Sequence, residues 1–393
     1  MKKSAFYDKI IENTKNVAKK RGEYGMISEK IREAFSAFGR KGEILGAEQI
    51  TAGLINATFL VITDEGEKYI LQKINTYVFK DVDGLMTNIA GVTKYLSEKI
   101  AKAGGNPERE TLRFIPCGEG KYYHTDAEGG AWRMYVYVDG TLTYNKAENA
   151  EMLRSAGKTF GRFMKLLADY PAETLNETIV NFHNTPSRYR DFLEAVEKDV
   201  AGRRAEVEKE IAFVTAREAD THRLTDLLEK GELPLRVTHN DTKLNNVLFD
   251  VATDESICVI DLDTIMPGLS LYDFGDSIRS GANRAREDEA DLAKIYVDLE
   301  LFEGYTDGYL SETADSLTDT EVENLAFGAK LMTFECGIRF LTDYLNGDVY
   351  FRTAYEGHNL RRARNQFRLV ESMEENMDKM QAIVRECRKK YVR

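Results

Sequence analysis

Short β-rich runs and long helical patterns occupy different parts of this chain, and this segregation constrains its fold more than any other feature. Strand signals dominate from about residue 47 to 114, where apolar runs at 59–62 and 69–71 flank a Thr-Asp-Glu-Gly turn. One helix interrupts them, because Asp81 can open a helix and the glycines at 104–105 can end it. The first part of the chain is therefore expected to form an antiparallel sheet with one helix.

A second strand pair, at about residues 111–124 and 131–138, is expected to complete this sheet. After residue 140 the helical pattern takes over. Helices are expected at about residues 147–168, 187–200, 204–230, 287–312, 318–346 and 356–390, with a short β-rich block at 235–263. The sequence thus predicts an α+β fold, with a small antiparallel lobe, a one-strand hinge near residues 135–140 and a larger, mainly helical lobe.

The N-terminal stretch 1–44 is charged and helical in character. Within it, Ile27, Ile31, Phe35 and Phe38 recur at spacings of 4, 4 and 3 residues. This spacing gives a helix one apolar face that can pack against a larger body.

Composition and charge exclude several classes of protein. The net charge of −12 makes the chain a poor partner for nucleic acid or an anionic membrane surface. No window approaches the ~18 uninterrupted apolar residues of a membrane span. The four cysteines are scattered, without the spacing of a zinc site, as is typical of reduced thiols in the cytosol. We expect a cytoplasmic protein, and its oligomeric state stays open.

The β-rich block carries the residues that indicate chemistry. His239-Asn240-Asp241 follows a strand, Asn246 comes five residues after Asp241, and a second apolar strand delivers Asp261. Phosphoryl transfer needs a carboxylate that orients the attacking hydroxyl and oxygen ligands that hold Mg²⁺ against phosphates. The string H-N-D-x-x-x-x-N also has the spacing of the protein-kinase catalytic loop. We predict Asp241 as the catalytic base and Asn246 with Asp261 as the metal ligands.

A second candidate for the metal is Asp273, in the Asp-Phe-Gly string at 273–275. It begins a helix-like stretch, whereas Asp261 ends a strand that suits a short hairpin return. We therefore predict that Asp273 tethers the catalytic loop by accepting backbone N–H bonds. Asp276 is expected to cap or pair locally.

The small lobe holds a candidate phosphate-binding turn. Gly53 lies between two strands and allows a tight backbone turn, whose N–H groups could cover phosphates. One strand later come Gln72 and Lys73, whose side chains must point to opposite faces of a sheet. Lys73 is the candidate cation for the phosphates, and which of the two faces them stays open. A Walker A loop is not supported, because position 152 is Met and the triplet 157–159 lies in a helical pattern.

The order of glycine-rich hairpin, ILQK strand, helix, hinge, HNDxxxxN and VID resembles the aminoglycoside phosphotransferase and choline kinase superfamily. Longer strings, among them THNDTKLNNVLFD and RFLTDYLNGDVYF, look like bacterial N-acetylhexosamine 1-kinases, which phosphorylate the anomeric hydroxyl of GlcNAc or GalNAc. The resemblance implies a protein-kinase-like, two-lobed fold that uses ATP and Mg²⁺. It also divides the chain into an N-terminal helical extension (1–27), a nucleotide-binding lobe (28–138) and a catalytic, substrate-binding lobe (139–393).

Carried over onto this sequence, the resemblance keeps Asp241, Asn246 and Asp261 in the roles given above. It implies a nucleotide site made of Gly53, Leu54, Ile55, Asn56, Ala57, Thr58, Gln72, Lys73, Tyr135, Tyr137 and Val138. Substrate binding would fall to His239, Asp241, Arg339, Asp343 and Tyr350. The chain departs from its relatives at Leu54, where they often carry His.

The leading hypothesis is therefore an ATP-dependent kinase acting on a small molecule, an amino sugar by resemblance. A second hypothesis keeps the chemistry and changes the acceptor to choline, homoserine, an aminoglycoside or another sugar. A third is a nucleotide-binding regulator without turnover.

Overall fold

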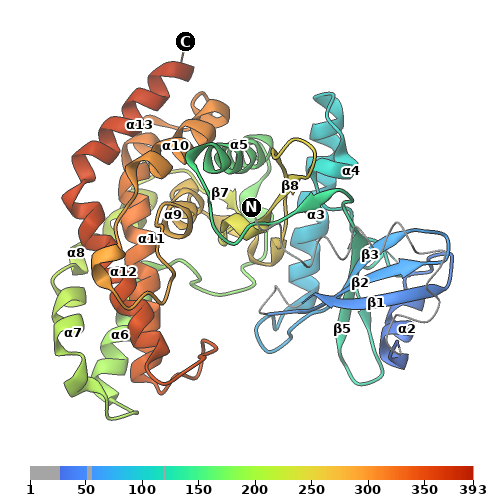
Figure 1. Ribbon diagram of the computed structural model, residues 1–393, viewed down its shortest axis with the longest axis horizontal. Coiled ribbons are helices and arrows are strands. Elements are labelled where there is room, and N and C mark those ends of the chain that lie inside the picture. Colours follow the sequence, from blue (N-terminus) through green and yellow to red (C-terminus); the bar gives the residue numbers. More distant parts are fainter. Residues whose placement is uncertain (1–26, 51–54, 119, 393) are drawn as a thin grey trace. The chain divides into compact units, whose positions relative to one another are not determined.

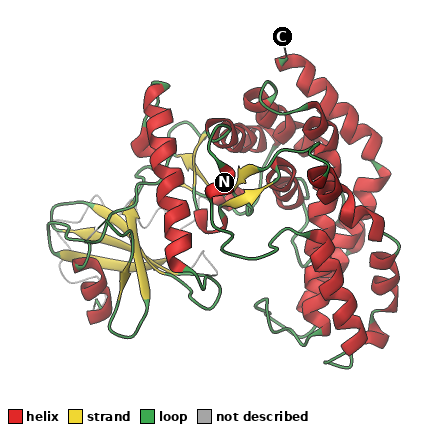
Figure 2. Ribbon diagram, turned by 180° about the vertical axis from the view of Figure 1, so that it is seen from behind, coloured by secondary structure: helices red, strands yellow, loops and turns green. Residues whose placement is uncertain are grey.

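The computed structural model describes residues 27–50, 55–118 and 120–392. The chain divides into two compact units: an N-terminal unit of Met1–Leu142 with Asp250–Ala252, and a C-terminal unit of Thr143–Phe249 with Thr253–Arg393. Strands concentrate in the first and helices in the second (Figures 1 and 2), which confirms the predicted α+β organisation. The expected extension at 1–26 lies outside the described residues.

The N-terminal unit is built around one sheet. Its elements are α2 (Glu29–Ser36), β1 (Ile44–Ile50), β2 (Ala57–Thr63), β3 (Lys68–Lys73), α3 (Val82–Lys102), α4 (Pro107–Glu110), β4 (His124–Thr125), β5 (Ala131–Val136) and β6 (Thr141–Leu142). Within the described residues, five of these strands pair antiparallel in the order β1-β2-β3-β5-β4. The predicted turn joins β2 to β3, and Gly66 adopts the positive φ of 84° that this turn requires.

Helix α2 covers one face of this sheet through the residues expected from their spacing. Ile31, Phe35 and Phe38 join a buried cluster with Val61, Leu71 and Met134 of the strands, and Ile27 packs against it. Helix α3 also begins as predicted, because the Asp81 carboxylate accepts a hydrogen bond from the Gly84 N–H at 2.8 Å.

The strand expected over residues 111–124 is largely wrong. Only β4 (His124–Thr125) pairs regularly, and an isolated bridge joins Phe114 to Tyr135. Gly118 and Gly120 both have positive φ, which is incompatible with a continuous strand.

The C-terminal unit is mainly helical. Its helices are α5 (Ala150–Leu166), α6 (Thr185–Lys198), α7 (Glu208–Thr215), α8 (Glu218–Glu229), α9 (Ser270–Gly281), α10 (Leu299–Thr313), α11 (Asp319–Leu345), α12 (His358–Glu375) and α13 (Met377–Tyr391). Its strands are β7 (Arg236–Thr238), β8 (Val247–Asp250), β9 (Ser256–Val259) and β10 (Met266–Gly268). Strand β7 pairs antiparallel with β10, and β8 with β9.

The helices at 147–168, 187–200 and 318–346 are confirmed, whereas three other expectations need correction. The stretch 204–230 is broken between α7 and α8, and 356–390 is broken at Asn376. Residues 287–298 are not an α-helix, because the Asp298 carboxylate caps α10 by accepting from the N–H groups of residues 300 and 301.

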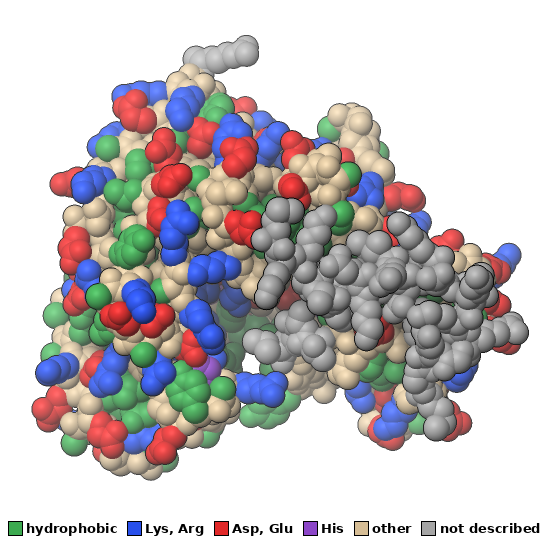
Figure 3. Space-filling view, in the orientation of Figure 1, with side chains coloured by type: hydrophobic (Ala, Val, Ile, Leu, Met, Phe, Trp, Pro, Cys, Tyr) green, Lys and Arg blue, Asp and Glu red, His purple; other side chains and the backbone are tan. Residues whose placement is uncertain are grey.

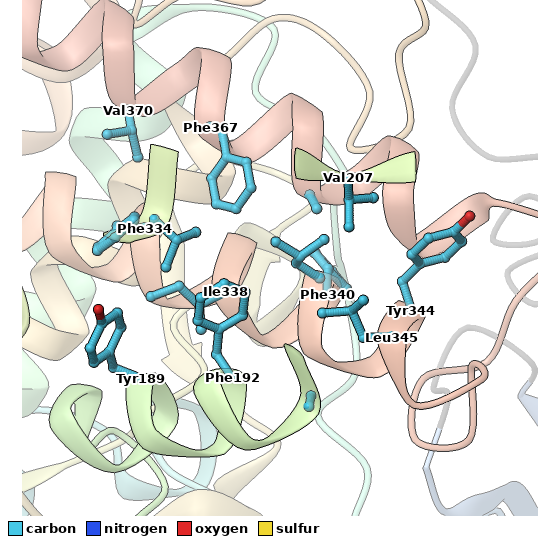
Figure 4. Close-up of a cluster of buried hydrophobic side chains, with 14 residues drawn as sticks. Tyr189, Phe192, Val207, Phe334, Ile338, Phe340, Tyr344, Leu345, Phe367 and Val370 are labelled. Carbon is cyan, nitrogen blue, oxygen red and sulfur yellow. The ribbon is translucent and has the colours of Figure 1, made fainter. Parts of the chain in front are cut away.

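A large apolar core fixes α11 in this unit. Side chains of α6, α11 and α12 interdigitate, as Figure 4 shows for Phe192, Phe334, Ile338 and Phe367, all of them buried. This packing holds α11 in place and so positions the polar residues on its opposite side. Among the described residues, no helix has both the length and the apolar character that crossing a membrane requires.

Candidate active site

The candidate catalytic residues come from the ends of two short strand pairs. Strand β7 ends at Thr238 and leads into a loop, a 3₁₀ turn at Leu244–Asn246 then opens β8, and β9 ends two residues before Asp261. The Ile260 N–H donates to the Asn246 carbonyl oxygen at 2.9 Å, which joins the two strand ends. The predicted convergence of Asn246 and Asp261 on adjacent strand ends is therefore present in the structure.

Asp273, on α9, binds the backbone of the catalytic loop. Its two carboxylate oxygens accept from the backbone N–H groups of His239 at 2.8 Å and Asn240 at 2.7 Å, which confirms the predicted tether. The Thr242 hydroxyl donates to the Asp273 carbonyl oxygen at 2.5 Å. Burial raises the pKa of Asp273 to about 6, although the His239 side chain and the two N–H donors oppose the rise.

Asp241 is held as an ion at the mouth of this loop. Its carboxylate lies 2.6 Å from the Lys243 ammonium, and the Asn246 side-chain amide donates to its carbonyl oxygen at 2.8 Å and to its carboxylate at 3.2 Å. Burial alone would raise the pKa of Asp241, but the charge of Lys243, aided by Arg279, keeps it below its ordinary value. An ionised, partly exposed carboxylate can accept a hydrogen bond from a substrate hydroxyl.

Lys243 was not among the residues predicted from the sequence. Asp241 and Asp276 raise its pKa against the effect of burial, so it stays cationic at neutral pH. Its position two residues after Asp241 is the sequence signal that could have identified Lys243. In the structure, the Thr242 side chain between them binds Asp273. Asp276 pairs locally as expected, with Arg279 three residues later at 2.7 Å.

The structure corrects the expectation that His239 binds a substrate. Its side chain is fully buried, at 0% exposure, and packs edge-on against Phe160 and Phe163. One ring nitrogen lies 2.9 Å from the Ile260 carbonyl oxygen, and the other accepts from the Asp241 N–H at 3.2 Å. His239 therefore positions Asp241 from inside the protein.

The donor set at Asn246 and Asp261 fits a hard divalent cation. Asn246 uses its amide nitrogen toward Asp241, so its amide oxygen points elsewhere, and Asp261 is an exposed carboxylate at a positive φ of 60°. Among the described residues, no group of three or more His, Cys, Asp and Glu side chains could hold a metal. Mg²⁺ is commonly bound by one or two protein ligands together with substrate phosphates, so these two residues match that manner of binding.

The candidate phosphate-binding turn is described only in part, because Gly53 and Leu54 lie outside the described residues. Ile55 is exposed, and the Asn56 side chain accepts from the Asn75 N–H at 2.9 Å, which anchors the end of the turn. Ala57 and Thr58 begin β2.

Gln72 and Lys73 point to opposite faces of the sheet, as strand geometry requires. Gln72 is buried beside Ile70, where it donates to Thr58 at 3.0 Å and accepts from Arg133 at 2.9 Å. Lys73 lies on the α2 face, 3.6 Å from the Asp126 carboxylate and 5.6 Å from the Trp132 ring. Gln72 shares its face with the apolar patch of Leu60, Ile62 and Ile70, against which Tyr135 and Tyr137 pack.

Gln72 therefore lies on the face with this buried apolar patch, and Lys73 lies on the opposite face, beside Asp126. Val138, at the end of the expected hinge, is buried, and its carbonyl oxygen accepts from the Thr141 hydroxyl at 2.7 Å. That contact fixes the backbone at Val138, one of the residues of the nucleotide site that the resemblance implies.

Arg339 and Tyr350 lie together near the end of α11. The Arg339 guanidinium is 5.2 Å from the Phe182 ring, 6.0 Å from the Tyr350 ring and 5.6 Å from the Phe351 ring. Tyr350 is 61% exposed, so its ring can meet a ligand. Both residues stay candidates for binding the acceptor.

Asp343 has a different role from the one expected. It is buried, and its carboxylate accepts from the N–H groups of Val349 at 2.9 Å, Tyr350 at 2.8 Å and Phe351 at 2.9 Å. The Asn359 side chain donates to it at 2.8 Å. The structure therefore corrects the prediction of substrate binding: Asp343 shapes the loop that carries Tyr350.

A comparison with protein-family models matches residues 46–309 to a model described as "Phosphotransferase enzyme family". This match spans more than half of the chain, including β1, the catalytic loop and most of α10.

Several solved structures share the fold at low sequence identity. The amicoumacin kinase hAmiN in complex with AMP-PNP, Ca²⁺ and Ami is 14% identical, with a TM-score of 0.57, 87% of this chain covered and 93% of that chain. A microcompartment-associated aminopropanol kinase is 16% identical, with a TM-score of 0.60 and coverages of 89% and 98%. An aminoglycoside phosphotransferase from Alicyclobacillus acidocaldarius subsp. acidocaldarius DSM 446 is 12% identical, with a TM-score of 0.52 and coverages of 95% and 98%.

Proposed function

The chain belongs to the phosphotransferase enzyme family and is an ATP-dependent small-molecule kinase; we propose that its acceptor is the C1 hydroxyl of an N-acetylhexosamine, GlcNAc or GalNAc. The choice of acceptor is supported by the strings around Asp241 and Arg339 that resemble N-acetylhexosamine 1-kinases. A role in carbohydrate metabolism would follow from such an acceptor.

The observation that carries the proposal is the state of Asp241. Its carboxylate is ionised, about a quarter exposed (27%), and fixed by Lys243 and Asn246. In this state it can accept the hydrogen bond of the C1 hydroxyl and orient one oxygen lone pair toward the γ-phosphorus. As the C1 oxygen bonds to the γ-phosphorus, the bond from that phosphorus to the bridging oxygen breaks, ADP leaves, and the hydroxyl proton passes to Asp241.

Lys243 adds positive charge at the same place. Its ammonium group is bound to Asp241 on one side and carries further N–H donors that can meet phosphate oxygens. Charge fixed before the reaction stabilises the negative charge of the transferring group without reorganisation. This arrangement needs the loop to be rigid, which the Asp273 tether supplies.

The proposed metal is Mg²⁺, held by Asn246 and Asp261. When bound, it would neutralise charge on the ATP phosphates and orient them. The nucleotide itself is proposed to bind beside the partly buried Tyr135 and Tyr137, which pack against the core of Leu60, Ile62 and Ile70.

A panel of acceptors tests this proposal. ADP release is measured with GlcNAc, GalNAc, choline, homoserine, kanamycin and 1-amino-2-propanol, the last because one protein of the same fold is an aminopropanol kinase. We expect selective turnover of GlcNAc or GalNAc, with a product that has lost its reducing end and shows a phosphorus signal coupled to the anomeric proton. Selective turnover of an amino alcohol or kanamycin would replace the proposed acceptor, and ATP binding without ADP release would favour a regulator without turnover.

A further inference from the structure

Two arginines from different helices converge on one residue beside the catalytic loop. Arg188, on α6, donates to the Phe182 carbonyl oxygen through two nitrogens, at 3.3 and 3.1 Å. Arg339, on α11, lies over the Phe182 ring at 5.2 Å. Their positive charges are therefore close, which is unfavourable unless negative charge is supplied nearby.

The carboxylates around this arginine pair do not supply that charge fully. Asp191 lies 3.6 Å from Arg188 but is half exposed (52%), so solvent screens the pair. The Glu335 carboxylate is buried, and its charge is shared with His183 at 2.7 Å and Thr185 at 2.6 Å, although His183 and then Arg339 lower its pKa against the effect of burial.

Among the residues that the structure describes, no carboxylate lies within 4.0 Å of the Arg339 guanidinium to form an ion pair. Burial, followed by the charge of Arg339, lowers the pKa of Arg188, which agrees with an excess of positive charge at this place. Figure 3 shows Lys and Arg side chains interspersed with Asp and Glu over the face of the C-terminal unit that it presents.

The arginine pair also connects to the catalytic carboxylate. His183, next to Phe182, places one ring nitrogen 3.1 Å from the carbonyl oxygen of Asn240, the residue before Asp241. Both arginines therefore contact Phe182, and the next residue, His183, contacts the catalytic loop directly. The exposed ring of Tyr350 also lies near Arg339, 6.0 Å from its guanidinium group.

We propose that Arg188 and Arg339 form a subsite for a negatively charged group, carboxylate or phosphate, and that the preferred acceptor is therefore an acidic derivative of GlcNAc or GalNAc. This inference rests on the proposed function, since it names a property of the acceptor that Asp241 would activate. Guanidinium groups match such oxyanions because they donate two parallel N–H bonds in one plane. Phe182, Tyr350 and Phe351 would hold the Arg339 guanidinium in the orientation that this contact needs.

The experiment compares matched neutral and acidic acceptors. GlcNAc is set against its C6 carboxylate, its C6 phosphate and its O3 lactyl ether, and kcat/KM is measured for the wild type, Arg339→Gln and Arg188→Gln. We expect the wild type to prefer at least one acidic acceptor by about tenfold to a hundredfold, the range of one or two hydrogen bonds to a charged group. Each variant should lose most of this preference, because kcat/KM falls much further on the acidic acceptors, mainly through KM, than on the neutral sugar.

Two controls separate a binding role from a folding role. Arg223→Gln removes another guanidinium that stacks on a ring, over Phe327 at 4.2 Å, and it should leave the acid preference unchanged. Because Arg188 also braces Phe182, Arg188→Lys is included to retain the charge and keep part of the preference.

Two results would overturn the subsite: equal or better use of the neutral sugar by the wild type, or variants that slow neutral and acidic acceptors by the same factor. In both cases the kinase proposal survives, because it requires only turnover. Absence of turnover on every sugar, with transfer to a positively charged acceptor, would refute the proposed acceptor and the subsite together.

Discussion

The tether at Asp273 yields a prediction in which activity and stability move in opposite directions. In Asp273→Asn, one N–H bond to the loop survives and the other meets an amide NH₂ group, because the two N–H groups of His239 and Asn240 bind different carboxylate oxygens. The loop that positions Asp241 then loses one charge-assisted hydrogen bond. At about 1.5–3 kcal/mol, this loss lowers kcat by roughly tenfold to a hundredfold if positioning depends on it.

The same substitution should not destabilise the fold at alkaline pH. The pKa of Asp273 rises from 3.8 to about 6, so ionising its carboxyl at pH 8 costs about 3 kcal/mol more in the folded state than in the unfolded state. A raised folded-state pKa gives stability that is complete below the unfolded value and is lost as pH rises through the folded value. We therefore expect Asp273→Asn to be at least as stable as the wild type at pH 8, with the difference fading between about pH 6 and pH 4.

Urea unfolding at pH 8, 6 and 4, together with ADP release at pH 8, measures both quantities. Asp226→Asn, an exposed change on α8, serves as the matched control and should alter neither. Unchanged kcat in Asp273→Asn would show that the tether does not position Asp241. A loss of more than about 2 kcal/mol at pH 8 would show that the buried carboxylate stabilises the fold, against the reasoning from its pKa.

Three further substitutions test other parts of the account. Asp343→Ala should raise KM for the acceptor several-fold and leave KM for ATP unchanged, because it frees the loop that carries Tyr350; equal changes in both constants would contradict this. Lys243→Met removes the cation that lowers the pKa of Asp241, so the acid limb of the kcat profile should move to higher pH, and an unmoved limb would argue against the pairing. Gly308→Ala places a Cβ atom against the Arg154 carbonyl oxygen of α5, which should cost about 1–3 kcal/mol in urea unfolding, and unchanged stability would contradict that close packing.

The positions of strands and motifs in the sequence predicted the centre of the candidate site well. Strand ends fix where a loop begins, so Asp241, Asn246 and Asp261 could be grouped from their places in the chain alone. Asp273 was also correctly predicted as a tether, because its place in a helical stretch distinguished it from a residue that ends a strand.

The burial of a side chain and the sheet face to which it points were harder to predict, because the sequence pattern does not encode them. The motif that contains His239 gives its residue type but not its complete burial between Phe160 and Phe163. Period-two alternation separates Gln72 from Lys73 but does not say which face carries the apolar patch. That assignment depends on pairing with β2 and β5, of which β5 lies far away in the sequence.

Asp343 and Arg188 were missed in their actual roles for a related reason. Asp343 shares a helix with Arg339, but its partners are backbone N–H groups of a loop that folds back on α11. Arg188 contacts Phe182 locally, but only the packing of α6 against α11 brings Arg339 to the same residue. Tertiary packing creates both contacts, so helical spacing alone could not reveal them.

The central claim is that Asp241 activates the C1 hydroxyl of an N-acetylhexosamine. The most direct test is the single-turnover rate of phosphate transfer from ATP to GlcNAc or GalNAc by the wild type and Asp241→Asn, with nucleotide affinity measured in parallel. The account predicts a sugar 1-phosphate from the wild type and a rate lower by about 10²–10⁴-fold in the variant, with ATP affinity retained. A variant that transfers phosphate at the wild-type rate, or a wild type that phosphorylates a different position, would contradict it.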